Sequence, residues 1–244
     1  MFAPIDVVFC VRARGSRGFT LVEMLVVMAI MALLASILLL AVAGFKGSQD
    51  ISKSSSDIQG VLEQARSLAM ADDTYVWIGF FEENPSTPGT AGTGQVVISV
   101  VSSSDGTQLF TNGNPPTSLP ATGLIQVNKL MKLPNLHLVS NVSPDIISTT
   151  AVPRPTVSGT YQVGSSSFSN NITFAYPIGG SQYQFSNVIQ FNPQGDATRI
   201  GSTPTQLMEI GLCPARGSTA LSTNKNLIAI QIAGIGGHVS VYRP

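Results

Sequence analysis

An uncharged apolar run near the N-terminus constrains this chain more than any other feature of its sequence. Residues Met24 to Phe45 read MLVVMAIMALLASILLLAVAGF, 22 residues without Asp, Glu, Lys, Arg or His. A helix of this length extends about 33 Å, which matches the hydrocarbon core of a bilayer, roughly 30 Å thick. The sequence therefore predicts one helix that spans a membrane.

The charges on either side of the run predict its orientation. Arg12, Arg14 and Arg17 precede it with no acidic residue among them, and Lys46 follows it directly. Basic flanks tend to remain in the cytoplasm. We expect a single-pass protein of the inner (cytoplasmic) membrane, with Lys46 at the far interface and the rest of the chain in the periplasm or in an extracellular filament.

A secretory signal peptide is the first alternative for this segment. It also has a basic region followed by an apolar run, and Ala41-Val42-Ala43 is similar to its cleavage site. The product would be a secreted soluble β protein that begins at Gly44. Against this reading, the run exceeds the ~7–15 apolar residues of a signal peptide, and Glu23 places a charge at its start.

The residues at the start of the run carry a more specific pattern. Arg17 to Val27 read RGFTLVEMLVV, which closely resembles the cleavage and methylation motif of type IV pilins and type II secretion pseudopilins. In that family a prepilin peptidase cuts after the glycine and the new N-terminal residue is methylated. The resemblance implies that residues 1–18 are a leader peptide, that cleavage follows Gly18, and that Phe19 is N-methylated. The leader departs from the family in its apolar stretch, Ile5 to Val11.

Glu23 becomes the fifth residue of the mature chain, where the family keeps a glutamate. An acid within hydrocarbon costs roughly 2.5–3.5 kcal/mol, so such a group is by default functional and has a partner. Residues 19–45 contain no Lys, Arg or His. The remaining cation is the amine of Phe19, from the same or an adjacent subunit, and we expect Glu23 to guide assembly with other pilins or pseudopilins. Alternatively, Glu23 lies at the lipid-water interface and only marks the start of the helix.

Beyond Lys46 the apolar residues recur at helical spacing, at Ile58, Val61, Leu62, Ala65, Leu68 and Ala69. We predict a transmembrane or filament-core helix at residues 19–46 and an amphipathic stem helix at residues 47–72, either continuous or bent at Gly44 and Gly47. The second helix is clearest from about Ser54 to Ala71. Ser54 to Asp57 offer side chains that could cap its start.

Residues 73–244 alternate between apolar and polar side chains and are rich in β-forming residues, which predicts a β-rich globular head. The fold class that follows is α+β, a long hydrophobic N-terminal helix packed on a mainly antiparallel β-sheet head. Gly234 to Gly237 predicts a hairpin turn. The expected strands are Tyr75–Phe81, Gln95–Val101, Leu124–Met131, Leu136–Ser140, Ile172–Tyr176, Tyr183–Phe191, Gln206–Leu212, Leu227–Ala233 and His238–Tyr242.

The head resembles the GspH/FimT branch of minor pseudopilins. The resemblance rests on Ala65-Arg66-Ser67 leading into Tyr75-Val76-Trp77-Ile78, and on Ile189 to Gly195 before the closing hairpin. The segment from Phe19 to Met31 is also similar to the Verru_Chthon cassette protein D family. These likenesses imply a minor pilin or pseudopilin, a structural subunit of a type II secretion or type IV pilus-like filament. The alternative is a DNA-binding minor pilin of an uptake (competence) pilus, since some FimT-like proteins bind DNA.

Few residues could carry other chemistry. The sequence has no G-x-S-x-G, H-E-x-x-H or C-x-x-C motif, and His137 and His238 are 101 positions apart. We therefore expect no enzyme, cofactor or metal site. Cys213 is expected to be a small buried residue at a strand end.

Charged residues of the head are also scattered. The acidic pairs Asp72-Asp73 and Glu82-Glu83 are expected to be solvated. DNA binding needs clustered basic residues, so we do not expect nucleic acid as a partner. The basic residues in question are Lys129, Lys132, Arg199, Arg216 and Arg243.

Overall fold

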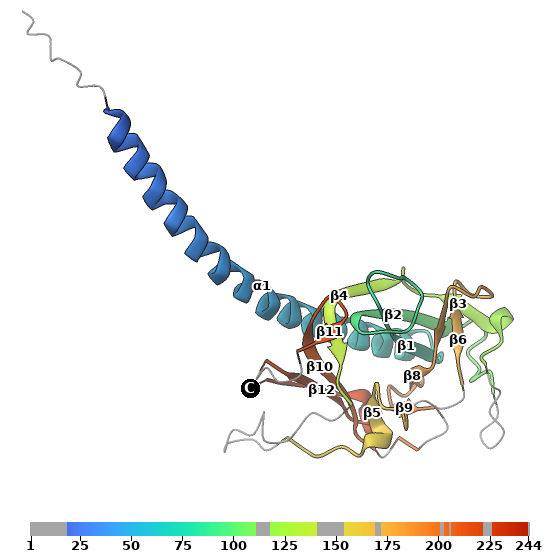
Figure 1. Cartoon of the computed structure of the whole chain (residues 1–244). Coiled ribbons are helices and arrows are strands. Elements are labelled where there is room, and N and C mark those ends of the chain that lie inside the picture. The colour runs from blue at the N-terminus through green and yellow to red at the C-terminus, as the bar shows by residue number, and fades with distance from the viewer. Residues whose placement is uncertain are drawn as a thin grey trace, which may run out of the picture. The chain divides into compact units, whose positions relative to one another are not determined.

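The computed structural model describes residues 19–110, 118–140, 154–168, 172–200, 203–204, 206–221 and 226–243, with the side chains of 37–49 left out. The chain divides into two units, Met1–Gly44 and Phe45–Pro244. Within the first unit, the described residues form the beginning of the long helix α1 (Leu21–Ala71), and the second unit holds the end of that helix and all of the strands (Figure 1).

Helix α1 includes both of the helices that the sequence predicts. Gly44 and Gly47, where a bend was the alternative, both lie within the residues of this helix. In the second unit the helix buries a face formed by residues at helical spacing, as expected. The residues of this face are Ile51, Ile58, Val61, Leu62, Ala65 and Ala69.

The prediction that Ser54 to Asp57 cap a helix start is wrong. These residues lie within α1, because the apolar face continues upstream to Ile51. The hydroxyls of Ser55 and Ser56 donate instead to the carbonyl of Ser52, at 2.9 and 3.2 Å. Serine makes this bond to the preceding turn when it occupies a helix interior.

The strands form one large sheet and one separate hairpin. The main sheet has the order β13-β12-β10-β4-β2-β1-β8-β9, with β3, β5 and β11 beside it, and β6 pairs with β7. All of these pairs are antiparallel except β5 with β10, so the expected α+β class is confirmed. The strands are β1 (Val76–Glu83), β2 (Gly94–Ser103), β3 (Leu124–Gln126), β4 (Met131–Leu138), β5 (Gln162–Val163), β6 (Phe174–Tyr176), β7 (Tyr183–Phe185), β8 (Asn187–Phe191), β9 (Ala197–Arg199), β10 (Met208–Arg216), β11 (Thr219–Ala220), β12 (Ile228–Ile232) and β13 (Val239–Tyr242).

Several strand boundaries differ from the expectation. The run predicted at Tyr183–Phe191 is divided at Ser186 into β7 and β8, which belong to different sheets. The run predicted at Leu124–Met131 contains only β3 and the first residue of β4. Strands β5, β9 and β11 were not predicted, because two or three residues are too few to show a period. The turn between β12 and β13 lies where the glycines predict it.

Two apolar layers lie on opposite faces of the main sheet. The alternating side chains of β1 separate them, since Ile78 and Phe80 join the layer that includes α1, whereas Trp77 joins the layer beneath the β6–β7 hairpin. Phe185 and Tyr183 of that hairpin are fully buried. This second layer explains why nearly every residue of β2 is buried, on both of its faces.

Candidate functional site

The first turn of α1 is closed by a reciprocal pair of hydrogen bonds between Thr20 and Glu23. The Glu23 backbone N–H donates to the Thr20 hydroxyl at 3.2 Å, and one Glu23 carboxylate oxygen accepts from the Thr20 N–H and hydroxyl at 3.0 and 3.1 Å. This arrangement is a capping box, which satisfies backbone donors that a helix start leaves without partners. It fixes the start of the helix at Leu21.

This capping role of Thr20 and Glu23 was not predicted from the sequence. Thr20-Leu21-Val22-Glu23 matches the S/T-x-x-E spacing that signals a helix start before an apolar run, and this pattern would have found it. The assembly role expected of Glu23 stays a prediction. Phe19 precedes the helix and is 78% exposed. Gly18, the expected cleavage residue, lies outside the described residues.

Apolar side chains cover every face of the first part of α1. Each described side chain from Phe19 to Ser36 is exposed to solvent. The exposed apolar residues lie on all sides of this part of α1, as Leu21, Met24, Leu25 and Met28 illustrate. Large apolar surfaces of this kind mark contacts with another molecule or with lipid.

Within the part of the chain that the structure describes, no helix has both the length and the mean hydropathy that a membrane span requires.

The head contains a buried carboxylate that the sequence did not predict. Glu83, expected to be solvated, has a fully buried side chain at the end of β1, while Asp72 and Asp73 are exposed as expected. Its oxygens accept from Lys132 Nζ at 2.8 Å and the Tyr183 hydroxyl at 3.0 Å. These partners come from β4 and β7, so residues far apart in sequence meet at this point.

Glu83 also fastens the loop that follows it. The Gly89 N–H donates to the second Glu83 oxygen at 2.7 Å. Burial alone would raise the pKa of Glu83, but hydrogen bonds from Lys132, Gly89 and Tyr183 outweigh it and hold the pKa below its ordinary value. Lys132 donates both to Glu83 and, at 2.6 Å, to the Tyr183 hydroxyl oxygen, and these two bonds raise the pKa of Lys132. The pair therefore remains ionised at neutral pH.

A second ion pair, buried on both sides, joins Arg154 to Glu209 of β10. Arg154 donates to the Glu209 carboxylate, with side chains only 3% and 1% exposed. Gln231 Nε2 also donates to Glu209 at 2.8 Å and to the Pro155 carbonyl at 2.7 Å. Gln162 donates to the Val157 carbonyl at 3.1 Å. Together these bonds hold residues 154–163 against the sheet, so the Arg154–Glu209 pair has a structural role.

Cys213 faces a histidine, but its environment keeps the thiol protonated. Cys213 is opposite His137 in the β10–β4 register, and His137 Nδ1 lies 2.6 Å from a Glu82 oxygen. Burial, with a smaller contribution from the Glu82 charge, raises the pKa of the Cys213 thiol to about 11. A nucleophilic cysteine needs a lowered pKa and access. Cys213 is buried as expected, although β10 continues past it to Arg216.

Three of the five basic residues considered for DNA binding are engaged within the head. Lys132 pairs with Glu83, Arg199 Nε donates to the Phe168 carbonyl, and Arg243 donates to the Ser55 hydroxyl. Lys129 and Arg216 are exposed.

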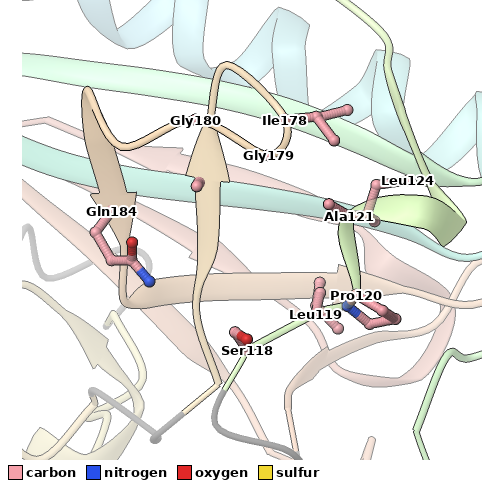
Figure 2. Close-up of a pocket in the computed structure, with 10 residues that line it drawn as sticks. Ser118, Leu119, Pro120, Ala121, Leu124, Ile178, Gly179, Gly180 and Gln184 are labelled. Carbon is pink, nitrogen blue, oxygen red and sulfur yellow. The ribbon is translucent and has the colours of Figure 1, made fainter.

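A surface cavity of about 300 Å³ opens beside the β6–β7 hairpin. Figure 2 shows Gln184 on one side of it, Gly179 and Gly180 at the hairpin turn, and the segment from Ser118 to Ala121 on the other side. The apolar part of the cavity wall is formed by Leu119, Leu124 and Ile178. No charged residue is among the described residues that line it.

One comparison with known proteins gives a match at the N-terminus. Residues 13–39 match the family model of the prokaryotic N-terminal methylation motif. The matched range includes Gly18, Phe19 and Glu23, and it is consistent with the resemblance to type IV pilins and pseudopilins. No curated protein and no solved structure matches the chain.

Proposed function

We propose that this chain, which carries the prokaryotic N-terminal methylation motif at residues 13–39, is a type IV pilin-like subunit processed by a prepilin peptidase after Gly18. In the finer form of the proposal it is a minor pilin or pseudopilin of a type II secretion or type IV pilus-like filament, with a head of the GspH/FimT kind. It acts as a structural subunit and catalyses no reaction.

The motif match is the observation that carries this proposal, and its position on the helix supports it. The expected cleavage point lies directly before Phe19, outside α1, and the capping box begins the helix one residue later. A peptidase requires an accessible backbone, and Phe19 is exposed. Cleavage here would leave a mature chain that begins almost at the first turn of its helix.

Membrane anchoring before assembly belongs to the same proposal. The motif suggests it, and the exposed apolar side chains from Leu21 to Leu34 supply the surface that lipid would cover. In the filament the same surface would pack against the helices of other pilins or pseudopilins. The head would lie in the periplasm or on the filament, where its two apolar layers stabilise it independently of the helix start.

A substitution at Gly18 tests the processing step. Gly18→Val should leave the precursor uncut by a prepilin peptidase, because cleavage in the family depends on the small residue before the cut. The substitution Gly15→Val, three positions upstream in the leader, is the matched control and should be processed normally. Electrophoretic size and intact mass measure the outcome, and a Gly18→Val protein of mature size would refute the proposal.

A further inference from the structure

The cavity beside the β6–β7 hairpin lies along one edge of β6. Leu119 N–H donates to the Thr173 carbonyl at 2.8 Å, and Ser118 forms a parallel bridge with Thr173. The Thr173 carbonyl therefore points away from β7. Backbone groups two residues apart in a strand point to the same edge. The N–H and carbonyl of Ala175 consequently also point away from β7, toward the side where Ala175 lines the cavity.

No described residue pairs with this outer edge of β6 beyond the Ser118 bridge. The segment that begins to pair there leaves at Pro120, which has no N–H to donate, and enters the short helix η1 (Ala121–Gly123). One end of the cavity is thus closed by the Leu119–Thr173 bond. At the other end are Gly179 and Gly180 of the hairpin turn (Figure 2).

The lining determines which ligand chemistry fits. The N–H and carbonyl of Ala175, for which the described part of the chain provides no strand partner on this edge, match the alternating groups of an extended peptide. Ser118 and Gln184 add uncharged polar groups, and the Gln184 amide nitrogen already donates to the Thr173 hydroxyl at 2.6 Å. A charged ligand would have no counter-charge, since none of the described lining residues is ionisable. The volume equals that of about ten water molecules, which limits the occupant to a short segment.

We propose that this cavity binds a short, uncharged, extended peptide segment that pairs with the Ala175 edge of β6 and places an apolar side chain against Leu119, Leu124 and Ile178. The site is separate from the helix start that carries the proposed processing and assembly. Its binding is therefore independent of whether the chain is a pilin-like subunit.

Titration of the full-length protein in detergent micelles tests this site. The probe is acetyl-Thr-Val-Thr-Val-amide, and the control probe is the same peptide with methylated backbone nitrogens, which has lost its donors. With the protein labelled with ¹⁵N-alanine, the peptide should shift the Ala175 amide signal, and the methylated peptide should leave it unchanged. The signal is assigned by its absence in Ala175→Val.

Two variants at one position separate backbone pairing from the shape of the cavity. Ala175→Val keeps the N–H, whereas Ala175→Pro removes it without removing a bond to β7, because this N–H points outward. Calorimetric titration should give an affinity about tenfold weaker for Ala175→Pro than for Ala175→Val, as expected for one lost hydrogen bond. Near-ultraviolet circular dichroism checks that the hairpin remains packed.

Any one of several binding results would overturn the proposal. They are equal binding of the methylated and unmethylated peptides, equal affinity of the two Ala175 variants, and the absence of any Ala175 shift up to the solubility limit of the peptide. Binding of a neutral disaccharide such as maltose in place of the peptide would assign the cavity to carbohydrate and equally contradict it.

Discussion

Glu23 is the residue on which the proposed assembly step depends, and the structure gives it two separable properties. Its carboxylate closes the capping box with Thr20, so it has a local partner before any other subunit arrives. It is also the only charged side chain between residues 19 and 45. A glutamine at the third helical position also closes a capping box. Glu23→Gln therefore removes the charge and keeps the cap.

We predict that Glu23→Gln leaves membrane insertion and cleavage after Gly18 intact but reduces co-assembly with other pilins several-fold. The measurement is crosslinking between N-terminal helices in native membranes. Thr20→Val is the comparison, since it removes the capping hydroxyl and keeps the charge, at a cost of about 1 kcal/mol to the helix start. Undiminished crosslinking by Glu23→Gln, or an equal loss in both variants, would show that the charge does not guide assembly.

Glu83 links the stability of the head to pH. Its pKa is lowered in the folded protein from an ordinary value of 4.5. The ionised form is therefore favoured by folding, and this contribution is fully present above the ordinary pKa and lost as pH falls through the lowered folded value. We predict that the free energy of unfolding in urea falls on acidification below about pH 4.5, and falls less steeply in Glu83→Gln.

Replacing the partner of Glu83 isolates the ion pair at neutral pH. Lys132→Met keeps an apolar stem beside the Tyr183 ring but removes the charged donor from a fully buried carboxylate. A loss of about 1–3 kcal/mol is expected. The double variant with Glu83→Gln should recover part of this loss, because no buried charge then lacks its cation. Equal stability of the wild type and Lys132→Met at pH 7 would contradict this role for the pair.

At the scale of elements, the contact between β1 and the β6–β7 hairpin depends on a glycine. A Cβ added at Gly79 would lie 2.5 Å from the Phe185 Cβ and 2.7 Å from the Phe174 ring. These two rings stack on each other, with centroids 5.1 Å apart. A side chain at position 79 would therefore push the hairpin away from the sheet. Gly60 on α1 offers the contrast, because nothing lies within 4 Å of a Cβ added there.

We predict opposite signs for the same substitution at these two glycines. Gly79→Ala should lower the free energy of unfolding by about 1–3 kcal/mol through overpacking. Gly60→Ala should raise it by up to about 1 kcal/mol, since alanine is the better helix former. Chemical denaturation of both variants measures the difference. A neutral Gly79→Ala would mean that the hairpin is not held against β1 as the structure shows.

For the whole molecule, the sequence predicts the parts whose signals are periodic and local. The apolar face of α1, the strands β1, β2, β10, β12 and β13, and the methylation motif are of this kind. The buried Glu83 was expected to be solvated, because its partners Lys132 and Tyr183 are 49 and 100 positions away. The run predicted at Tyr183–Phe191 is divided at Ser186 for a similar reason, because β7 pairs with β6 whereas β8 joins the main sheet. Such features follow from tertiary contacts that no window of sequence contains.

The proposed function requires that a prepilin peptidase removes residues 1–18 as a leader. Mass spectrometry of the protein purified from native membranes tests it most directly. A mature chain that begins with an N-methylated Phe19 is the result that our proposal predicts. A chain that begins at Gly44, as signal-peptide cleavage would produce, or one that keeps its leader where other pilins are processed, would contradict it.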